Sequence, residues 1–300
     1  MTSSTAEILD PDPPYALAGA APAVWRIPLV FSSPHSGSVY TSAFQASSKL
    51  DPVSLRRSED AFVDELFARG AEAAGAPLLS ALFPRAYVDV NREPWELDPA
   101  MFDGKLPDFV NTRSPRVGGG LGTLARVVAN GTDIYRGKLS FPEAQRRIET
   151  LYTPYHAALA DLLARGTAKF GRVALIDCHS MPSIGGPMDR DPGKRRADFV
   201  LGDCHGRACA SGLIDAAEKH LRDAGFVVAR NEPYAGGYIT RHYGKPTNGH
   251  HALQIEINRG LYMDEARIAR APGFDKLRDA LTALTAALAR IAPTLPGPKE

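Results

Sequence analysis

Short apolar segments alternate along this chain with longer segments of helical periodicity, and this alternation constrains the fold more than any other feature. Short apolar runs between turn residues predict buried strands, and apolar residues recurring every three to four positions predict helices. Because strands alternate with helices, we expect an α/β fold with helices on both faces of one sheet. The predicted strands are 27–32, 78–82, 86–90, 173–177, 199–202, 226–229 and 253–258. The predicted helices are 61–74, 141–166, 205–224 and about 264–291, the last one broken at Pro272.

The length of 300 residues suits a single α/β domain. We expect a loosely ordered N-terminal arm over residues 1–24 and one catalytic domain over 25–300. The segment 91–135 is rich in Gly, Pro and Asp, and a connection this long predicts a binding loop or a lid. Its glycine-rich part, 116–122, lacks the Lys-Ser/Thr ending of a phosphate loop, so a flexible loop is the better interpretation.

Composition excludes several classes of partner. The net charge is +1 with acids and bases interspersed, which argues against a nucleic-acid partner. No apolar run is long enough to predict a membrane span, and the N-terminus lacks the basic region of a signal peptide. The three cysteines are too few, and odd in number, for a disulfide framework. We therefore expect a cytoplasmic protein.

Two histidines come at the ends of predicted strands. His35 follows the run 27–32, and His179 follows the run 173–177. The carboxyl ends of such strands line the ligand crevice of an α/β sheet, and imidazole is a common zinc ligand. Either histidine alone is more typical of a hydrogen-bonded loop residue, but the pair in one context favours a shared metal ion. Asp177 lies on the same side of the extended chain as His179 and could orient its imidazole.

A third metal ligand is expected, because catalytic zinc sites usually have three protein ligands and a water. The candidates are the carboxylates Glu59 and Asp60, which follow Ser58 and precede a predicted helix. A side chain at such a position also caps the helix N-terminus. The position alone therefore does not separate a ligand from a cap.

Glu256 lies inside a predicted strand. Alternation places Leu253, Ile255 and Ile257 on one face and Glu256 on the other. In a central strand an ionised glutamate is costly unless it is paired or lies beside a metal, where it could act as a general base. In an edge strand the same side chain would face solvent. The pattern alone leaves both interpretations open.

Two further segments carry groups suited to a substrate. Asn91 and Arg92 follow the predicted strand 86–90, and the planar guanidinium of arginine suits a carboxylate. Thr240, Arg241 and His242 lie between glycines in the segment 236–244, a composition that suits a pocket wall. An ordinary surface arginine and a structured loop would give the same patterns.

Together these segments resemble the N-formylglutamate amidohydrolase family. The matching segments run in the family's order from about Val30 to Glu265, and jointly they are highly specific. They are SPHSG, SEDAFVDELF, VDVNREP, VVANGTDIYRGKL, TPYH, DCHSMPS, FVLGDCHG, GGYITRHYG and HALQIEINRGLYMDE. The segments 93–99 and 120–126 depart from the family pattern, as in a divergent subgroup.

The resemblance implies a three-layer αβα fold of the phosphorylase/hydrolase-like type, similar to that of zinc carboxypeptidases, with a mixed sheet of about eight strands. It implies one zinc ion bound by His35, Asp60 and His179. Glu59 is the alternative carboxylate, because adjacent acids make the alignment ambiguous. Histidine and carboxylate ligands also admit Mn, Fe, Co or Ni.

The resemblance also implies the roles of the remaining groups. Glu256 would be the general base, and Asn91 with Arg92 would grip a substrate carboxylate. Arg241 would polarise the scissile carbonyl or bind a second carboxylate. The predicted reaction is hydrolysis of a small N-acyl amino acid, such as N-formyl-L-glutamate, by zinc-activated water. The alternatives are a zinc carboxypeptidase, a deacylase with another acyl group, and a non-catalytic metal or amino-acid binding homologue. The oligomeric state is not predicted.

Overall fold

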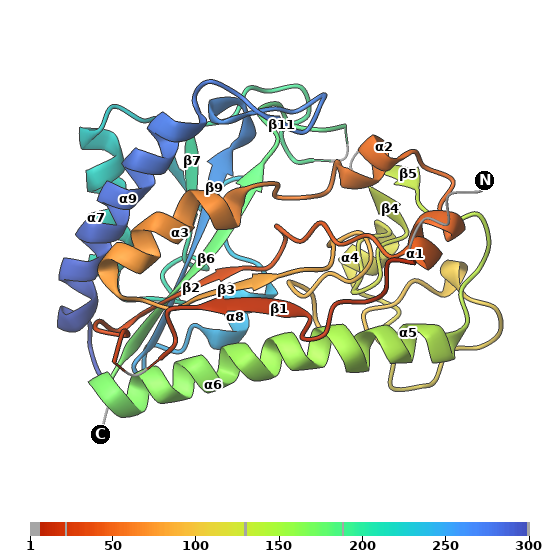
Figure 1. Ribbon diagram of the computed structural model, residues 1–300, viewed down its shortest axis with the longest axis horizontal. Coiled ribbons are helices and arrows are strands. Elements are labelled where there is room, and N and C mark those ends of the chain that lie inside the picture. Colours follow the sequence, from red (N-terminus) through yellow and green to blue (C-terminus); the bar gives the residue numbers. More distant parts are fainter. Residues whose placement is uncertain (1–6, 22, 129–130, 188, 299–300) are drawn as a thin grey trace.

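The computed structural model describes residues 7–21, 23–128, 131–187 and 189–298. A seven-stranded mixed sheet in the order β1-β3-β2-β6-β9-β7-β8 crosses the middle of the molecule (Figure 1). Its strands are β1 (Tyr15–Ala18), β2 (Leu29–Ser33), β3 (Leu78–Ala81), β6 (Val173–Met181), β7 (Phe199–Gly202), β8 (Val228–Arg230) and β9 (His250–Asn258). Two small ribbons flank it, β4 (Val127–Val128) with β5 (Thr132–Asp133) and β10 (Met263–Asp264) with β11 (Ala269–Arg270).

Strand direction determines which ends meet. The neighbours β3, β2, β6 and β9 are parallel, so their carboxyl ends reach the same edge of the sheet. At one side β1 runs antiparallel to β3, and at the other β7 runs antiparallel to β9 and parallel to β8. Side chains from β2, β6 and β9 can therefore converge at one crevice.

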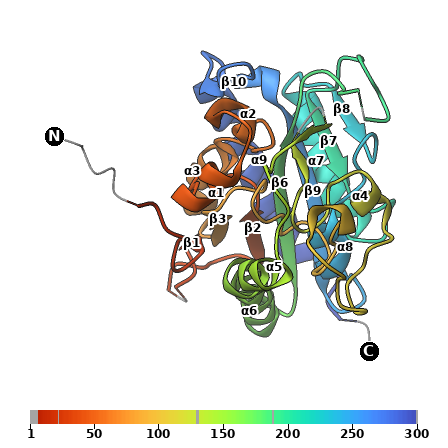
Figure 2. The same cartoon turned by 90° about the vertical axis from the view of Figure 1, so that its right-hand side faces the viewer.

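Helices cover both faces of the sheet. One face is covered by α3 (Val63–Ala74), α7 (Ser211–Asp223) and α9 (Phe274–Ile291), and α6 (Thr153–Phe170) runs along the other (Figures 1 and 2). α5 (Phe141–Arg147) continues into α6 through a π-helical turn at Ile148–Tyr152. The short helices are α1 (Ser42–Ser47), α2 (Pro52–Arg56), α4 (Pro115–Gly118) and α8 (Tyr238–Tyr243), with 3-10 turns at Pro99–Met101, Arg259–Leu261 and Ala292–Thr294.

The alternation of side chains along the central strands divides the core in two. In β6, Ala174 and Ile176 pack with α3, α7 and α9, whereas Val173 and Leu175 pack on the side of α6. Successive side chains of a strand point to opposite faces, and here both faces are covered. This explains why β6 begins with a continuous apolar run, residues 173–176. The coverage of both faces also confirms the predicted three-layer α/β class.

Several predicted elements differ in the structure. The prediction of a strand at 86–90 is wrong, because the N–H groups of Tyr87 and Val88 bond to the carbonyl of Pro84 and close a turn instead. β1 forms within the predicted loose arm, where it pairs with β3. The last helix begins at Phe274 rather than near 264, and the residues before it form the β10–β11 ribbon.

Much of the segment 91–135 is packed rather than extended as a loop. Leu97, Leu124 and Ile134 are fully buried in the same core as α6. Gly122 allows the main chain to approach Glu96 closely, since a Cβ there would lie 2.1 Å from the Glu96 carbonyl oxygen. The segment 116–122 includes α4 and this close contact, and the flexible loop expected there stays a prediction.

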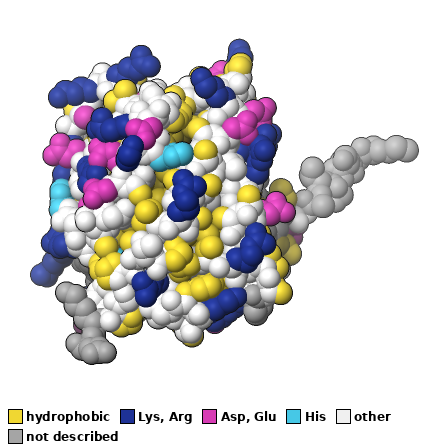
Figure 3. All heavy atoms as spheres, turned by 90° about the vertical axis from the view of Figure 1, so that its left-hand side faces the viewer, with side chains coloured by type: hydrophobic (Ala, Val, Ile, Leu, Met, Phe, Trp, Pro, Cys, Tyr) yellow, Lys and Arg dark blue, Asp and Glu magenta, His cyan; other side chains and the backbone are white. Residues whose placement is uncertain are grey.

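Within the described residues, none of the helices combines the length and apolarity needed to cross a membrane. One face of the molecule shows acidic and basic side chains interspersed with apolar ones (Figure 3). That face carries no large patch of a single charge.

Candidate metal and catalytic site

His35, Asp60 and His179 converge at the carboxyl edge of the sheet. His35 follows β2 and Asp60 precedes α3, whereas His179 lies within β6, which continues beyond the predicted strand end to Met181. The Asp60 N–H donates to the carbonyl of His35 at 3.0 Å, which joins the two loops. All three residues are buried, with exposed fractions of 2% or less.

The side-chain atoms of this group meet around one point. Asp60 Oδ2 lies 3.2 Å from His35 Nδ1 and 2.9 Å from His179 Nδ1. Ligand atoms about 2.0–2.1 Å from a tetrahedral zinc ion are about 3.3 Å apart. The three donor atoms also lie within 4.8 Å of one another. Spacing and donor type therefore fit a divalent metal ion.

A second layer of carboxylates orients the imidazoles. His35 Nε2 lies 2.8 Å from Asp89 Oδ1, and His179 Nε2 lies 3.0 Å from Asp177 Oδ1. Each carboxylate accepts an Nε2–H, so Nδ1 is the imidazole nitrogen that faces Asp60. The expectation for Asp177 thus matches its position, whereas Asp89 was not singled out from the sequence.

Asp60 is held with one oxygen facing the histidines. Its Oδ1 accepts a hydrogen bond from Arg259 Nη2 at 3.0 Å and one from Ser180 Oγ at 3.3 Å, which leaves Oδ2 on the side of the imidazoles. Burial alone would raise the pKa of Asp60, but hydrogen bonds and charges from His179 and His35 hold that pKa well below its ordinary value. Burial likewise opposes protonation of His179, yet the Asp177 and Asp60 carboxylates raise its pKa well above the ordinary value. The group is thus a negative pocket in which positive charge is favoured.

Glu59 points elsewhere. Arg56 donates to both of its carboxylate oxygens at 2.9–3.1 Å, and Tyr40 donates to Oε1 at 2.6 Å. Of the two adjacent acids, the fold therefore brings Asp60 to the histidines and uses Glu59 in an ion pair with α2.

Glu256 lies beside His179 on the neighbouring strand, with the two residues paired in register. Because β9 is flanked by β6 and β7, the edge-strand alternative is wrong. Gln254 Nε2 donates to Glu256 Oε1 at 2.8 Å. Burial raises the pKa of Glu256 to about 7, with the charges of His179 and Asp60 acting in opposite directions. A carboxyl with such a pKa can both accept and return a proton near neutral pH.

Asn91 faces the same crevice, although no strand leads to it. Its Oδ1 accepts the Ile239 N–H at 2.8 Å, and its Nδ2 lies 3.1 Å from His179 Nε2. When His179 Nε2 donates to Asp177, it cannot accept from Asn91. The Asn91 amide N–H groups then remain available to a ligand.

Arg92 is more constrained than the sequence suggested. Its Nε donates to the carbonyl of Leu121 and its Nη1 to that of Asn91, at 2.9 and 2.8 Å. Its Nη2 lies 3.7 Å from Asp89, and burial lowers the pKa of Arg92 to about 10. Nη2 thus carries two N–H donors and, among the described residues, makes only this longer contact with Asp89.

Arg85 is a second basic group that the sequence reasoning missed. Its Nη2 donates to Asp89 at 2.8 Å, and its side chain is 23% exposed. Burial would lower the pKa of Arg85, but the charges of Asp89, Asp60 and Glu256 raise it. The sequence shows only an arginine six positions before Asn91. This arginine reaches the site because a turn replaces the predicted strand 86–90.

The residues of α8 occupy three different environments. Thr240 is fully buried and donates to Asp177 at 2.8 Å, so its hydroxyl is bonded to the carboxylate that orients His179. Arg241 is 61% exposed, with Nη2 3.9 Å from Glu93. His242 is exposed and stacks on Tyr238, with ring centroids 4.9 Å apart. Arg241 and His242 thus lie at the surface near segment 91–135.

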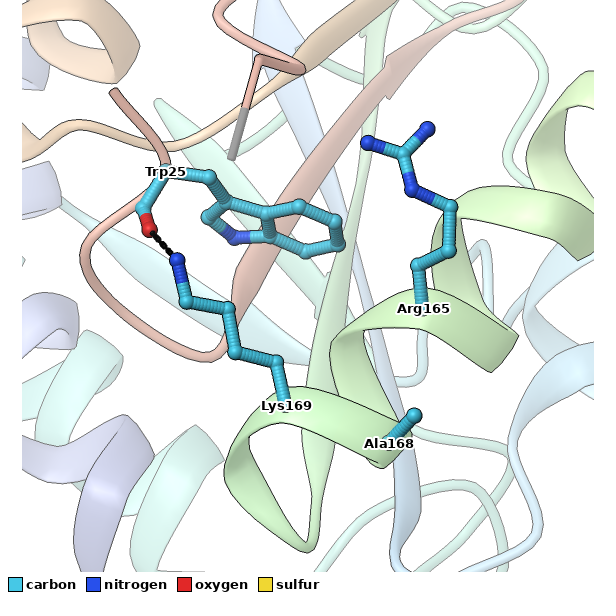
Figure 4. Close-up of a pocket in the computed structure, with 4 residues that line it drawn as sticks. All are labelled: Trp25, Arg165, Ala168 and Lys169. Atoms are coloured by element: carbon cyan, nitrogen blue, oxygen red, sulfur yellow. Dashed lines mark hydrogen bonds between the residues drawn. The ribbon is translucent and has the colours of Figure 1, made fainter. Parts of the chain in front are cut away.

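A cavity of about 360 Å³ lies elsewhere, lined by Trp25, Arg165, Ala168 and Lys169 (Figure 4). Lys169 Nζ donates to the Trp25 carbonyl at 2.6 Å. Trp25 precedes β2 and the other residues belong to the last turns of α6, which lead into β6. The cavity is therefore at the amino end of the sheet, opposite the histidines, and it is not part of the candidate site.

Both the sequence and the fold are similar to those of known proteins. A sequence model of the N-formylglutamate amidohydrolase family matches residues 27–263. An N-formylglutamate deformylase from Pseudomonas aeruginosa is 33% identical over 245 residues, covering 80% of this chain and 84% of that protein. One from Pseudomonas putida is 30% identical over 244 residues, covering 80% and 83%.

Two solved structures are similar. A crystal structure of an N-formylglutamate amidohydrolase from Ralstonia eutropha JMP134 superposes with a TM-score of 0.85 at 38% identity, covering 94% of this chain and 99% of that one. A gene product from Agrobacterium tumefaciens shares the fold at 20% identity with a TM-score of 0.67, covering 92% and 95%.

Proposed function

Because this chain belongs to the N-formylglutamate amidohydrolase family, we propose that it hydrolyses the amide bond of an N-acyl amino acid, with N-formyl-L-glutamate as the first candidate substrate. The observation that carries the proposal is the convergence of His35, Asp60 and His179 beside Glu256. The names of the relatives support the formyl group and glutamate.

His35, Asp60 and His179 would hold one divalent metal ion, with zinc as the first candidate. Such an ion supplies Lewis-acid chemistry, lowering the pKa of a water and polarising the amide carbonyl. Two imidazoles and a carboxylate also suit Mn, Fe, Co and Ni. Asp89 and Asp177 keep the imidazoles oriented toward Asp60.

Glu256 would act as the general base and then as the general acid. It accepts a proton from the attacking water as the water oxygen bonds to the formyl carbon. It returns a proton to the amide nitrogen as the C–N bond breaks, which releases formate and the free amino acid. Gln254 holds Oε1, which leaves Oε2 for the transferred proton. A pKa of about 7 suits both steps at neutral pH.

Positive and amide groups would hold the remaining parts of the substrate. We assign the negative charge developing on the carbonyl oxygen to Arg85, which is near Asp60 and Glu256 and only partly exposed. Asn91 Nδ2 and Arg92 Nη2 would bind the α-carboxylate. Arg241, exposed near segment 91–135, better suits a second carboxylate than the scissile carbonyl.

The test begins with metal analysis of purified protein, followed by a panel of N-formyl-L-glutamate, N-acetyl-L-glutamate and a short peptide, with and without chelator. We expect chelator-sensitive turnover of the formyl compound. Glu256→Gln keeps the size of the side chain and removes the base, so kcat should fall about 10²- to 10⁴-fold with an unchanged metal content. Full activity of Glu256→Gln at normal metal content would refute the assignment of the base.

A further inference from the structure

Two side chains from the start of α6 contact the main chain on either side of Asn91. Tyr152 ends the π-helical turn, and its hydroxyl donates to the carbonyl of Arg92 at 2.8 Å. His156 Nε2 lies 2.8 Å from the carbonyl of Val90. Residues four apart lie on the same side of a helix, so both reach one segment. Single π-helical turns are frequent at functional sites.

The partners of His156 determine its tautomer. The Val90 carbonyl can only accept, so Nε2 carries the proton. Nδ1 then accepts from the Tyr243 hydroxyl, 2.9 Å away. Burial lowers the pKa of His156 to about 4, which keeps the ring neutral. Tyr243 belongs to α8, so the network extends from α6 to α8.

Separate hydrogen bonds fix the Asn91 residue between these two carbonyls. Asp89 Oδ1 accepts the Asn91 N–H at 2.9 Å, and the Ile239 N–H holds Asn91 Oδ1. Gly237 permits this approach, because a Cβ there would lie 2.3 Å from Asn91 Nδ2. Since 90–92 belongs to no strand, no sheet ladder satisfies its carbonyls, and the bonds from Tyr152 and His156 take that place.

We propose that Tyr152 and His156 are positioning residues that hold the peptide 90–92 so that Asn91 and Arg92 are preset for a substrate carboxylate. This gives a role to the TPYH segment, whose histidine the catalytic steps do not use. The inference rests on the proposed function, in which Asn91 and Arg92 bind that carboxylate.

Four variants test it in the metal-loaded enzyme. Tyr152→Phe removes one hydroxyl, and His156→Leu removes the donor to Val90. His156→Gln keeps an N–H near the position of Nε2 and should rescue binding. Tyr155→Phe is the matched control, because the buried 2.8 Å hydrogen bond that it loses from the same helix goes to Ser32 and not to a carbonyl of 90–92.

We expect Tyr152→Phe and His156→Leu to raise KM about 5- to 50-fold with kcat within about twofold, and Tyr155→Phe and His156→Gln to stay near wild type. Unchanged KM in Tyr152→Phe and His156→Leu would overturn the inference, as would an equal rise in Tyr155→Phe.

Calorimetric titration with L-glutamate and N-formyl-L-glutamate gives a second readout that does not need turnover. If wild-type protein hydrolyses nothing, the proposed reaction fails. The positioning inference still stands if Tyr152→Phe and His156→Leu bind these ligands more weakly than Tyr155→Phe does. It falls if all variants bind equally, or if none, wild type included, binds either compound.

Discussion

Asp89 connects the candidate metal group to Arg85 and Arg92, and its replacement is the most informative single change. It accepts from His35 Nε2 and from the Asn91 N–H through Oδ1, and it pairs with Arg85 through Oδ2. Asp89→Asn keeps the shape and one acceptor oxygen but removes the charge. We therefore expect both metal affinity and stability to fall.

Two magnitudes follow from the structure. Outer carboxylates that orient metal-binding histidines typically contribute about 10- to 100-fold in affinity. Breaking a buried ion pair costs about 3–5 kcal/mol. The lower end applies here, because the Arg85 side chain is 23% exposed and that of Asp89 is 6% exposed. A loss of about 3 kcal/mol would lower the Tm of a domain of this size by roughly 5 °C.

The assay is competition for zinc with a chromophoric chelator, together with thermal unfolding of the metal-free protein. Asp133→Asn is the control, because it removes an exposed carboxylate that pairs with Lys49 and Arg126 far from the histidines. We expect it to leave zinc affinity unchanged. Wild-type zinc affinity and Tm in Asp89→Asn would refute the argument that this carboxylate orients His35.

Three further predictions concern catalysis, pH and the core. Arg85→Gln should lower kcat about 10²-fold with a modest change in KM, whereas Arg241→Gln should mainly raise KM; the reverse pattern in steady-state kinetics would exchange their roles. Because burial lowers the pKa of His156 to about 4, the unfolded chain takes up a proton below about pH 6.5 that the folded protein excludes. The free energy of unfolding should thus fall by up to about 3 kcal/mol between about pH 6.5 and pH 4. Urea titrations of His156→Gln over this pH range should lack that part of the pH dependence. Leu175→Ala, in fully buried β6, should cost about 2–5 kcal/mol by denaturant unfolding while leaving zinc stoichiometry unchanged; no measurable loss would contradict the packing described here.

The local pattern of the sequence was enough to predict the layers and the main elements. β7 has the predicted bounds, and α3 and α9 end where glycine or irregular chain follows their apolar periodicity. The continuous apolar run of β6 reports burial on both faces, which is a property of the segment itself. The histidines could be singled out for the same reason, since each stands out against an apolar run.

Other features depended on contacts distant in sequence. β1 exists because β3 offers it a partner, and the turn at 84–90 replaces a strand because Pro84 accepts two N–H groups there. Neither event leaves a periodic signal, since pairing energy comes from the partner rather than from the segment.

Glu59 and Asp60 show most directly which features depend on the sequence and which depend on the tertiary structure. Both acids precede the same helix, and the sequence alone determined only that one of them could join two strand-associated histidines. The tertiary structure brings Asp60 to the histidines, because Arg56 and Tyr40 hold Glu59 away while Arg259, about 200 positions later, bonds to the other oxygen of Asp60. The roles of Arg85 and Asp89 could not be predicted from the sequence for the same reason. They depend on which charges the folded chain brings within a few ångströms of each other.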